Sequence, residues 1–421
     1  MVDLDQLVSV PAPTDQPWRT DPDRYWRDLD DAVRQCDNPV ATLSLPALRH
    51  NIDDLRRRAA GVPLRIASKS LRMRPIIDAL VRLDHVVGVL AYDLAEALWL
   101  AGDGPDRDGI TDVLMGYPGT NRRAIAALCA DSQALQRITL LVDSIEHLDL
   151  IDAVVPPKRR EAVRVAIDLD ASLRLPVIGD LGVLRSPVHT TADALTLARH
   201  VVGRPGFTLN GVMSYEAQVA GVGNDVPGKP LQNNMIRAIQ RASMVELRSR
   251  RRRVIAAIAE LADLQLVNAG GTGSIEETAK DPSVTDIAVG SGFFGGHLFD
   301  NYRSFAPAPA LAFALAVVRK PRPDVVTCHG GGWIASGPPD TDRLPQAVWP
   351  TGLAYQSREG AGEVQTPLRG PAARSLRVGD RVWFRHTKSG EMSEHVNSVT
   401  LVDNGPAGDV LTYRGEGKAF L

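Results

Sequence analysis

Short apolar runs separated by amphipathic, helix-like stretches dominate the middle of the chain. Runs that are apolar at nearly every position are typical of parallel strands buried on both faces. Eight such units within residues 64–289 predict a closed (β/α)8 TIM-like barrel of the α/β class, with an open doubly wound sheet as the alternative. The eight runs are Leu64–Ala67, Val86–Leu90, Thr111–Met115, Ile138–Val142, Val163–Leu169, Thr208–Met213, Leu264–Val267 and Ile287–Val289.

The pattern changes on both sides of these runs. Residues 1–39 contain several prolines and a charged helical stretch, and they read as an N-terminal extension. A strand and a helix then open the barrel domain, which we expect over residues 40–303. Prolines and glycines become frequent after it, and the predicted strands become short, with alternating polar and apolar residues, as in residues 381–385. Residues 304–421 are therefore predicted to form a C-terminal, mainly antiparallel β domain.

Composition excludes several classes of protein. The chain has 421 residues, 44% of them hydrophobic, and a formal net charge of −2, so no general attraction to nucleic acid or to an anionic membrane is expected. The arginine-rich residues 248–253 fall in a helical pattern without aromatic residues, which indicates a solvated helix face. No apolar run is long enough to span a bilayer. Three widely spaced cysteines and the lack of a basic, apolar leader favour a cytoplasmic protein.

A lysine follows the first apolar run. Residues 64–72 read LRIASKSLR, and a period of two places Lys69 on the same face as Ala67. The carboxyl ends of parallel strands are where α/β barrels keep their chemistry. Arg72 and Arg74 follow closely, and nearby positive charge disfavours an ammonium ion, so we expect an amine able to form a Schiff base. The alternative is an ordinary solvated lysine.

A glycine-rich loop follows the seventh run. Glycines let the backbone approach an anion, hydroxyl groups add donors, and the helix that follows offers free N–H groups. Residues 270–274 read GGTGS and precede a helical pattern, so they predict a phosphate cradle, which residues 290–292 after the eighth run would complete. The alternative is a tight turn without a ligand. A strand-end lysine and a phosphate cradle on one barrel rim together indicate pyridoxal 5′-phosphate (PLP).

Polar residues follow other strands at the same rim. Asp168 and Asp170 share one strand face, where two carboxylates serve either acid–base work or ion pairs with neighbouring arginines. The remaining strand ends carry Tyr92, Asp93, Gly116, Tyr117, Asp143, Ser144, Ser214 and Tyr215.

These residues resemble those of a known family. The chain is similar to the fold-type III PLP enzymes, the alanine racemase-like barrels, and most of all to their D-threonine aldolase and D-serine dehydratase branch, which includes sequences labelled amino acid deaminase/aldolase. The resemblance covers residues 40–421 and is most specific at residues 66–70, 268–274, 289–292 and 377–386.

The resemblance implies roles for individual residues. Lys69 would be the Schiff-base lysine, and Tyr215 would lie against the cofactor ring, although a buried structural aromatic is the alternative for Tyr215. Arg174 would lie near the ring oxygen or the substrate carboxylate, although its surroundings are offset by one residue from the family pattern. The phosphate ligands would be Gly271, Thr272, Gly273 and Ser291.

The C-terminal domain raises the question of a metal. In the resembling enzymes a histidine and a cysteine or aspartate two positions later bring a divalent metal to the β-hydroxyl group. The matching histidine is His386, implied to be catalytic, but Lys388 stands at the second position, and an ammonium ion cannot ligate. Either Glu391, Cys328 or another side chain completes the site, or Lys388 itself replaces the charge of the metal.

The resemblance thus implies a PLP-dependent lyase for small D-3-hydroxy amino acids. The reaction is either retro-aldol cleavage to glycine and an aldehyde or β-elimination of water. An amino-acid racemase and a non-catalytic PLP-binding protein are the alternatives. A homodimer is implied by the resemblance alone.

Overall fold

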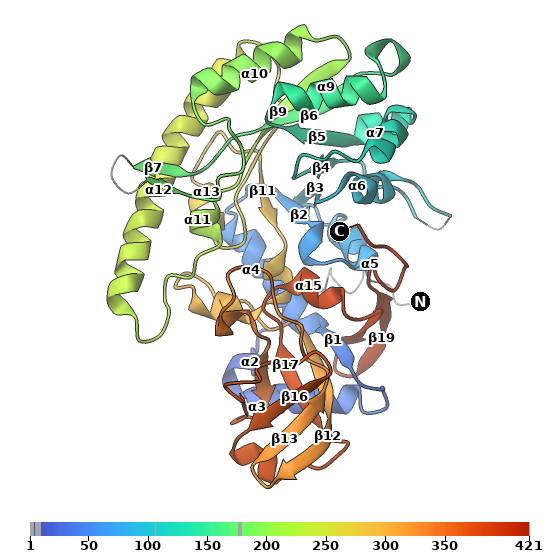
Figure 1. The fold of residues 1–421 in the computed structure, drawn as a ribbon, viewed down its shortest axis with the longest axis vertical. Helices are drawn as coiled ribbons and strands as arrows, with labels where there is room; N and C mark the ends of the chain where they lie inside the picture. The colour runs from blue at the N-terminus through green and yellow to red at the C-terminus, as the bar shows by residue number, and fades with distance from the viewer. Residues whose placement is uncertain (1–3, 5–9, 106, 176–178, 421) are drawn as a thin grey trace. The chain divides into compact units, whose positions relative to one another are not determined.

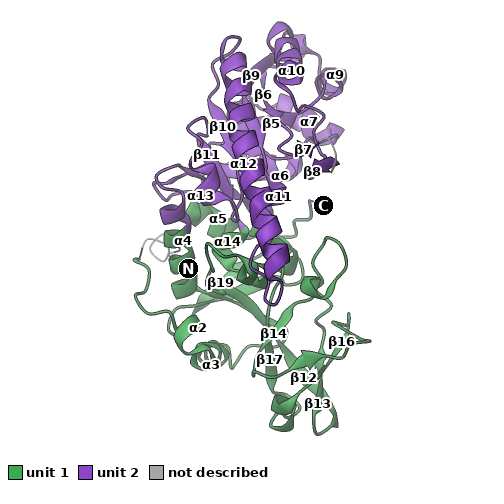
Figure 2. Cartoon of the chain, turned by 90° about the vertical axis from the view of Figure 1, so that its left-hand side faces the viewer, with its two compact units in different colours: residues 1–54, 70–80, 291–419 green, residues 55–69, 81–290, 420–421 purple. Residues whose placement is uncertain are grey.

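The chain divides into two compact units, each built from segments that are distant in the sequence. The computed structural model describes residues 4, 10–105, 107–175 and 179–420. The unit that we call the β unit comprises residues 1–54, 70–80 and 291–419, and the barrel unit comprises residues 55–69, 81–290 and 420–421 (Figure 2).

The barrel unit contains a closed ring of parallel strands (Figure 1). Their order around the ring is β2-β3-β4-β5-β6-β9-β10-β11, and β11 pairs with β2 to close it. Each strand overlaps one of the eight predicted runs, so the predicted barrel is confirmed and the open sheet is wrong. The strands are β2 (Leu64–Ala67), β3 (Val86–Ala91), β4 (Val113–Met115), β5 (Ile138–Val142), β6 (Val163–Asp168), β9 (Phe207–Ser214), β10 (Leu266–Ala269) and β11 (Asp286–Val289).

The interior of the barrel is filled in layers. Toward the amino ends of the strands, the buried Arg65 guanidinium pairs with Asp286 at 2.8 Å and with Asp112 at 2.9 Å. Because side chains fill the interior, the barrel is a packed core rather than a pore, and its carboxyl end is left for chemistry. Above the charged layer lies an apolar layer formed by Ala67, Leu90, Leu114, Leu141, Ala166, Met213, Leu266 and Ala288.

Helices alternate with the barrel strands, as the amphipathic stretches predict. The longest, α12, packs against α10, and Thr190 begins α10 with a capping box that includes Asp193. Among the described residues, no helix combines the length and the apolar character needed to cross a bilayer. The elements are η1 (Ser68–Ser70), α6 (Leu94–Ala101), α7 (Arg122–Cys129), α8 (Ser132–Arg137), α9 (Ile145–Val154), η2 (Pro157–Arg159), the hairpin β7 (Leu173–Leu175) and β8 (Gly179–Leu181), α10 (Thr191–Gly203), α11 (Ala217–Ala220), α12 (Pro230–Ala259) and α13 (Ile275–Thr278).

The β unit contains a mainly antiparallel sheet, which confirms the predicted second fold. In it β1 lies between β12, to which it is antiparallel, and β18, to which it is parallel. The strands are β1 (Val40–Ser44), β12 (Leu311–Arg322), β13 (Val325–His329), β14 (Gln346–Trp349), β15 (Ala354–Tyr355), β16 (Gln365–Arg369), β17 (Arg381–Arg385), β18 (Ser398–Val402) and β19 (Pro406–Leu411). The helices are α2 (Pro17–Thr20), α3 (Pro22–Ala32), α4 (Leu45–Arg58, which the division between the units crosses), α5 (Arg74–Leu80), α14 (Ser291–Phe294), η3 (His297–Asn301), η4 (Thr341–Arg343), η5 (Pro371–Arg374) and α15 (Ser389–Ser393).

The N-terminal helices α2 and α3 belong to the β unit. Tyr25 donates a hydrogen bond to the carbonyl of Pro309 at 2.8 Å, and the indole of Trp383 donates to Asp30 at 3.0 Å. Apolar and aromatic burial thus ties the predicted extension to the sheet, where Trp26 also contacts Trp383. The linear boundaries at residues 39/40 and 303/304 stay predictions.

Candidate active site at the carboxyl end of the barrel

The inward-facing positions that follow the apolar layer form the candidate site, which we call the barrel mouth. Side chains alternate along a strand, so the residue two positions beyond a member of the apolar layer projects toward the same interior. Asp168 is such a residue at the end of β6, and Asp143 and Tyr215 follow directly after β5 and β9. Lys69 follows β2 in the turn η1, and its amine contacts Tyr117 after β4. An amine, two carboxylates and a phenol therefore stand at the carboxyl ends of strands of one ring.

The amine of Lys69 is held by a tyrosine. After β2 the chain turns through η1, where the buried Ser68 hydroxyl donates to the carbonyl of Leu90 at 3.2 Å. Lys69 itself is exposed, and its Nζ donates to the hydroxyl oxygen of Tyr117 at 2.7 Å. Tyr117 follows the end of β4, and although its place at the rim is visible in the sequence, nothing there connects it to Lys69.

The two arginines that follow Lys69 in sequence have carboxylate partners of their own. Arg72 pairs with Glu394 at 2.7 Å, and Arg74 pairs with Asp78 at 2.7 Å. Their positive charges are therefore compensated within the β unit, and they provide less support for a reactive Lys69 amine than their sequence positions suggest.

Tyr215 packs closely against the glycine-rich loop. Its half-buried ring lies on the apolar layer, and burial raises the pKa of the Tyr215 hydroxyl to about 12, so the group remains a phenol at neutral pH. A Cβ atom on Gly271 would lie 2.9 Å from Cε2 of Tyr215 and 3.0 Å from Cβ of Ala220. Only glycine therefore lets the loop backbone approach the aromatic ring this closely.

A buried carboxylate organises the same loop. Glu216 accepts hydrogen bonds from the Gly270 amide at 3.3 Å, from the Ser274 hydroxyl at 3.2 Å and from the Thr278 hydroxyl. The Ser274 oxygen in turn accepts from the Gly271 amide at 3.1 Å. These hydrogen bonds fix the loop backbone around one buried carboxylate. Sequence analysis did not single out Glu216, whose only sequence signal is that it follows Tyr215.

Glu216 is linked to a buried ion-pair network. The guanidinium of Arg251 lies 3.4 Å from Glu216 and 3.0 Å from Asp281, and all three side chains are inaccessible to solvent. The carboxylates neutralise Arg251, and the arginine anchors the loop to α12. Arg250 is buried as well, so two residues of the arginine-rich run contradict the predicted solvated face.

Replacing Glu216 by alanine is expected to destabilise the barrel and loosen the loop. Three donors lose their acceptor and Arg251 loses one of two carboxylates, so the free energy of unfolding should fall by about 2–3 kcal/mol. Urea unfolding gives this change, and hydrogen exchange of residues 270–278 should accelerate. The exposed Glu260→Ala serves as control. Exchange in residues 270–278 equal to that of the control would contradict the role of Glu216.

The remaining predicted phosphate ligands lie in two units. Thr272 and Gly273 are in the loop, and the Thr272 carbonyl accepts from Arg58 at 2.6 Å. Ser291 is the first residue of α14, directly after Gly290, and belongs to the β unit. The role of Ser291 stays a prediction.

Arg174 and Arg185 occupy different positions at the rim. Arg174 lies on β7, 45% exposed, and pairs with Asp170 at 3.4 Å and with Asp180 at 3.9 Å. Arg185, which sequence analysis did not select, lies with its guanidinium carbon 5.8 Å from the centre of the Tyr117 ring. The predicted cofactor or substrate contact of Arg174 stays a prediction.

The environments of Asp168 and Asp170 are opposite. Burial and the neighbouring carboxylate of Asp143 raise the pKa of Asp168 to about 7, against a smaller lowering effect of Arg185. Burial also acts to raise the pKa of Asp170, but hydrogen bonds from Ser172 and His189 hold it below its ordinary value. The ion-pair interpretation therefore suits Asp170, and the acid–base interpretation suits Asp168.

His386 is enclosed within the β unit. Its Nδ1 lies 2.9 Å from the carbonyl of Leu311, which can only accept, so Nδ1 carries the proton. Its Nε2 then accepts from the Ser389 hydroxyl at 2.8 Å. Burial lowers the pKa of His386 to about 3, so the ring is neutral at neutral pH. Both ring nitrogens are occupied by protein groups.

The residues around His386 do not fit a divalent metal. Glu391 accepts from the Ser336 amide at 2.9 Å, and Lys388 donates to the Ser336 hydroxyl at 2.9 Å. Burial raises the pKa of the Cys328 thiol to about 12, which disfavours a thiolate ligand. Within the described parts of the chain, no group of three or more His, Cys, Asp or Glu side chains is arranged to hold a metal ion.

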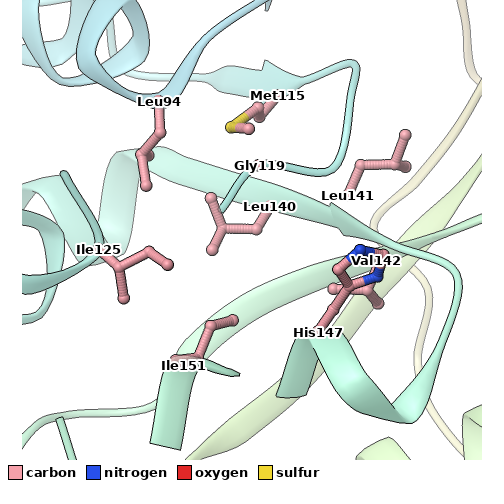
Figure 3. A pocket seen from close by; sticks show the side chains of 9 residues that line it. All are labelled: Leu94, Met115, Gly119, Ile125, Leu140, Leu141, Val142, His147 and Ile151. Atoms are coloured by element: carbon pink, nitrogen blue, oxygen red, sulfur yellow. The ribbon is translucent and has the colours of Figure 1, made fainter. Parts of the chain in front are cut away.

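A small cavity lies beside β5 and is lined by residues of α6, α7 and α9 as well (Figure 3). Its volume of about 10 Å³ is at the lower limit for one water molecule, so it is too small for a cofactor. Its one ionisable lining residue, His147, is 3.2 Å from Asp143. The cavity is lined by Leu94, Met115, Gly119, Ile125, Leu140, Leu141, Val142, His147 and Ile151.

Comparison with known proteins places this geometry in context. A family profile described as "Alanine racemase, N-terminal domain" matches residues 43–297. That range contains all the barrel strands and the mouth residues. No curated protein sequence matches the chain.

Several solved structures share the fold over nearly the whole chain. D-threonine aldolase from Filomicrobium marinum is 18% identical, with a TM-score of 0.74 over 91% of this chain and 96% of that one. D-threo-3-hydroxyaspartate dehydratase from Delftia sp. HT23 is 19% identical, with a TM-score of 0.67 over 90% and 98%. Alanine racemase from Clostridium difficile 630 is 12% identical, with a TM-score of 0.59 over 89% and 98%. At these identities the likeness shows the fold alone.

Proposed function

Because the chain belongs to the family of the alanine racemase N-terminal domain, we propose that it is a PLP-dependent lyase acting on small D-3-hydroxy amino acids. The observation that carries this proposal is the contact of the exposed Lys69 amine with Tyr117 at the mouth of a barrel whose glycine-rich loop packs on Tyr215. Similarity in fold to an aldolase and a dehydratase that act on such substrates supports it.

The residues of the barrel mouth fit PLP. Lys69 would hold the cofactor aldehyde, the Tyr215 ring would lie against the pyridine ring, and Gly271, Thr272 and Gly273 would hold the phosphate. Because Gly271 has no Cβ atom, the aromatic ring of Tyr215 can approach the loop backbone closely on one side, and an anion can approach it on the other. We also propose Ser291 as a phosphate ligand and Arg174 as a contact of the ring or substrate.

In the proposed reaction the residues of this chain bind and orient the substrate and transfer protons. PLP, when bound, withdraws electrons from Cα of the attached substrate. The Lys69 amine accepts or returns a proton at the substrate nitrogen, and Tyr117 fixes the position of that amine. Tyr215 remains protonated and acts as a donor and an apolar surface rather than as a base.

A product assay tests the proposal. Wild-type protein loaded with PLP is mixed with D-threonine and D-serine, and the products are identified. Glycine with an aldehyde indicates retro-aldol cleavage, which we place first, and a 2-oxo acid with ammonia indicates β-elimination. The dehydratase among the similar folds keeps elimination as the second candidate. Racemisation without either product would instead indicate a racemase, and a spectral shift without turnover would indicate a PLP-binding protein.

The activity is expected to survive removal of divalent metals. His386 has both ring nitrogens in hydrogen bonds, and Lys388 replaces the second expected ligand. Treatment with EDTA followed by elemental analysis should therefore leave turnover unchanged. If the reaction used a divalent metal, its removal would lower turnover, and added Mn²⁺ or Zn²⁺ would restore it. If EDTA lowered the turnover of the wild type but not the turnover of His386→Ala, a metal site formed by His386 and Glu391 would be re-established.

We further propose that the protein is a cytoplasmic homodimer. Cys36, Cys129 and Cys328 are unpaired, as expected for a reducing compartment. Sedimentation equilibrium measures the oligomeric state. The proposed partner is a small amino-acid substrate, with no nucleic acid or membrane.

A further inference from the structure

Asp168 and Lys69 enter the barrel mouth from opposite walls. In the ring order β2-β3-β4-β5-β6-β9-β10-β11, β6 lies four strands from β2 in either direction. Asp168 is two residues after Ala166, and Lys69 is two residues after Ala67, and both alanines belong to the apolar layer. The strand end that carries Asp168 therefore stands across the ring from the strand end that Lys69 follows.

Among the described residues, no ion pair stabilises the side-chain carboxylate of Asp168. Its backbone carbonyl accepts from the Ser186 hydroxyl at 2.6 Å, but among the described residues no ion pair within 4 Å includes its side chain. The side chain of Asp168 is partly buried and stands among like charges. Such a carboxylate without an opposing partner lowers stability, which is typical of groups kept for function. Its neighbour Asp170, by contrast, is bonded to His189 at 2.9 Å.

The groups that face Asp168 come from each adjoining element. Asp143 at the end of β5 is of like charge, and Tyr215 at the end of β9 is a neutral phenol. Asp170 continues the same strand, and Arg185 in the loop after β8 supplies the one opposing charge acting on Asp168 among the described residues. Together with burial, the like charges outweigh Arg185, and the pKa of Asp168 rises to about 7.

We propose that Asp168 is the catalytic base that takes the proton of the substrate's β-hydroxyl group, an inference that rests on the proposed lyase function. As the proton moves to Asp168, the O–H electron pair becomes the second bond of the aldehyde carbonyl, and the Cα–Cβ pair remains on Cα. Cα then takes up one proton, and Asp168 releases its own to water. Glycine and the aldehyde together contain all atoms of the substrate.

The role is tested first with Asp168→Asn, which keeps the shape and removes the base. Turnover of D-threonine should fall by about 10²- to 10⁴-fold, with PLP binding unchanged. Asp149→Asn on α9, where the side chain is 60% exposed, is the matched control and should retain wild-type turnover. Asp168→Asn that retains wild-type turnover would overturn the role of Asp168 alone. If the wild type forms neither product, the lyase function fails, and the role of Asp168 fails with it.

A second measurement does not depend on turnover. Carboxyl NMR of PLP-free protein should show a group titrating near pH 7 that is absent from Asp168→Asn. Asp143→Asn should move that titration to lower pH, and Arg185→Gln should move it to higher pH. Because the base form is required, kcat/KM should rise through the same pH range, and its midpoint should move with the NMR titration in both variants. A midpoint that stays in place while the titration moves would overturn the proposal.

Discussion

Lys69→Ala is expected to abolish turnover and covalent labelling together. The amine after β2 is needed to bond the cofactor aldehyde and to release it to the substrate amine. Without it, activity should fall by about 10³-fold or more, as when a covalent catalytic group is removed. Borohydride reduction of PLP-loaded wild type, followed by peptide mapping, should label Lys69 and no other lysine.

Two further variants separate chemistry from charge. Lys69→Arg keeps the positive charge and a donor for Tyr117 but cannot form the bond, so it should be as inactive as the alanine variant. Lys158→Ala removes an exposed lysine in η2 and should behave as wild type. Label on a lysine other than Lys69, or turnover by Lys69→Arg, would end the PLP proposal.

Arg65→Met is expected to cause the largest loss of stability. Burial acts to lower the pKa of Arg65, but the carboxylates of Asp286 and Asp112 together raise it above its ordinary value, so the guanidinium is charged at all relevant pH values. Removing it leaves the buried Asp286 uncompensated, and breaking such a pair costs about 3–5 kcal/mol. The free energy of unfolding from urea titration measures this loss.

The controls for Arg65 distinguish charge from packing. Arg253→Met changes an exposed arginine of α12 and should stay within about 0.5 kcal/mol of wild type. Arg65→Met combined with Asp286→Asn removes the orphaned charge and should recover part of the loss. A double variant that is no more stable than the single one would show that packing, not charge, explains the effect.

The barrel strands could be predicted from the sequence because buried parallel strands appear as continuous apolar runs. Residues 138–142 are all buried, and in residues 163–168 only Arg164 and Asp168 are partly exposed. Strands buried on both faces are apolar at nearly every position. Lys69 and the loop around Gly271 were readable for a related reason, since each stands directly after a strand end. By contrast, the pairing of β1 with β12 and β18 joins segments separated by more than 250 residues, and short local patterns carry no record of it.

The contacts of the site residues could not be predicted from the sequence. Tyr117 reaches Lys69, Arg185 lies over Tyr117, and Glu216 holds the loop of Gly270, yet each contact crosses between elements far apart in the chain. For His386, the sequence suggested a ligand, but only the positions of Leu311 and Ser389 show how its ring nitrogens are used.

By itself the sequence indicated the eight strands and the amine and glycine loop at their ends, because burial on both faces and strand-end position are local properties. It favoured a barrel over an open sheet, and the pairing of β11 with β2 decided between them. Only the tertiary structure decided that Asp168 stands across the ring from Lys69 with no ion-pair partner among the residues described, while Asp170 is bonded to its neighbours. Two aspartates two positions apart look alike in a sequence. Their desolvation and partners depend on strands and loops that meet only when the ring closes.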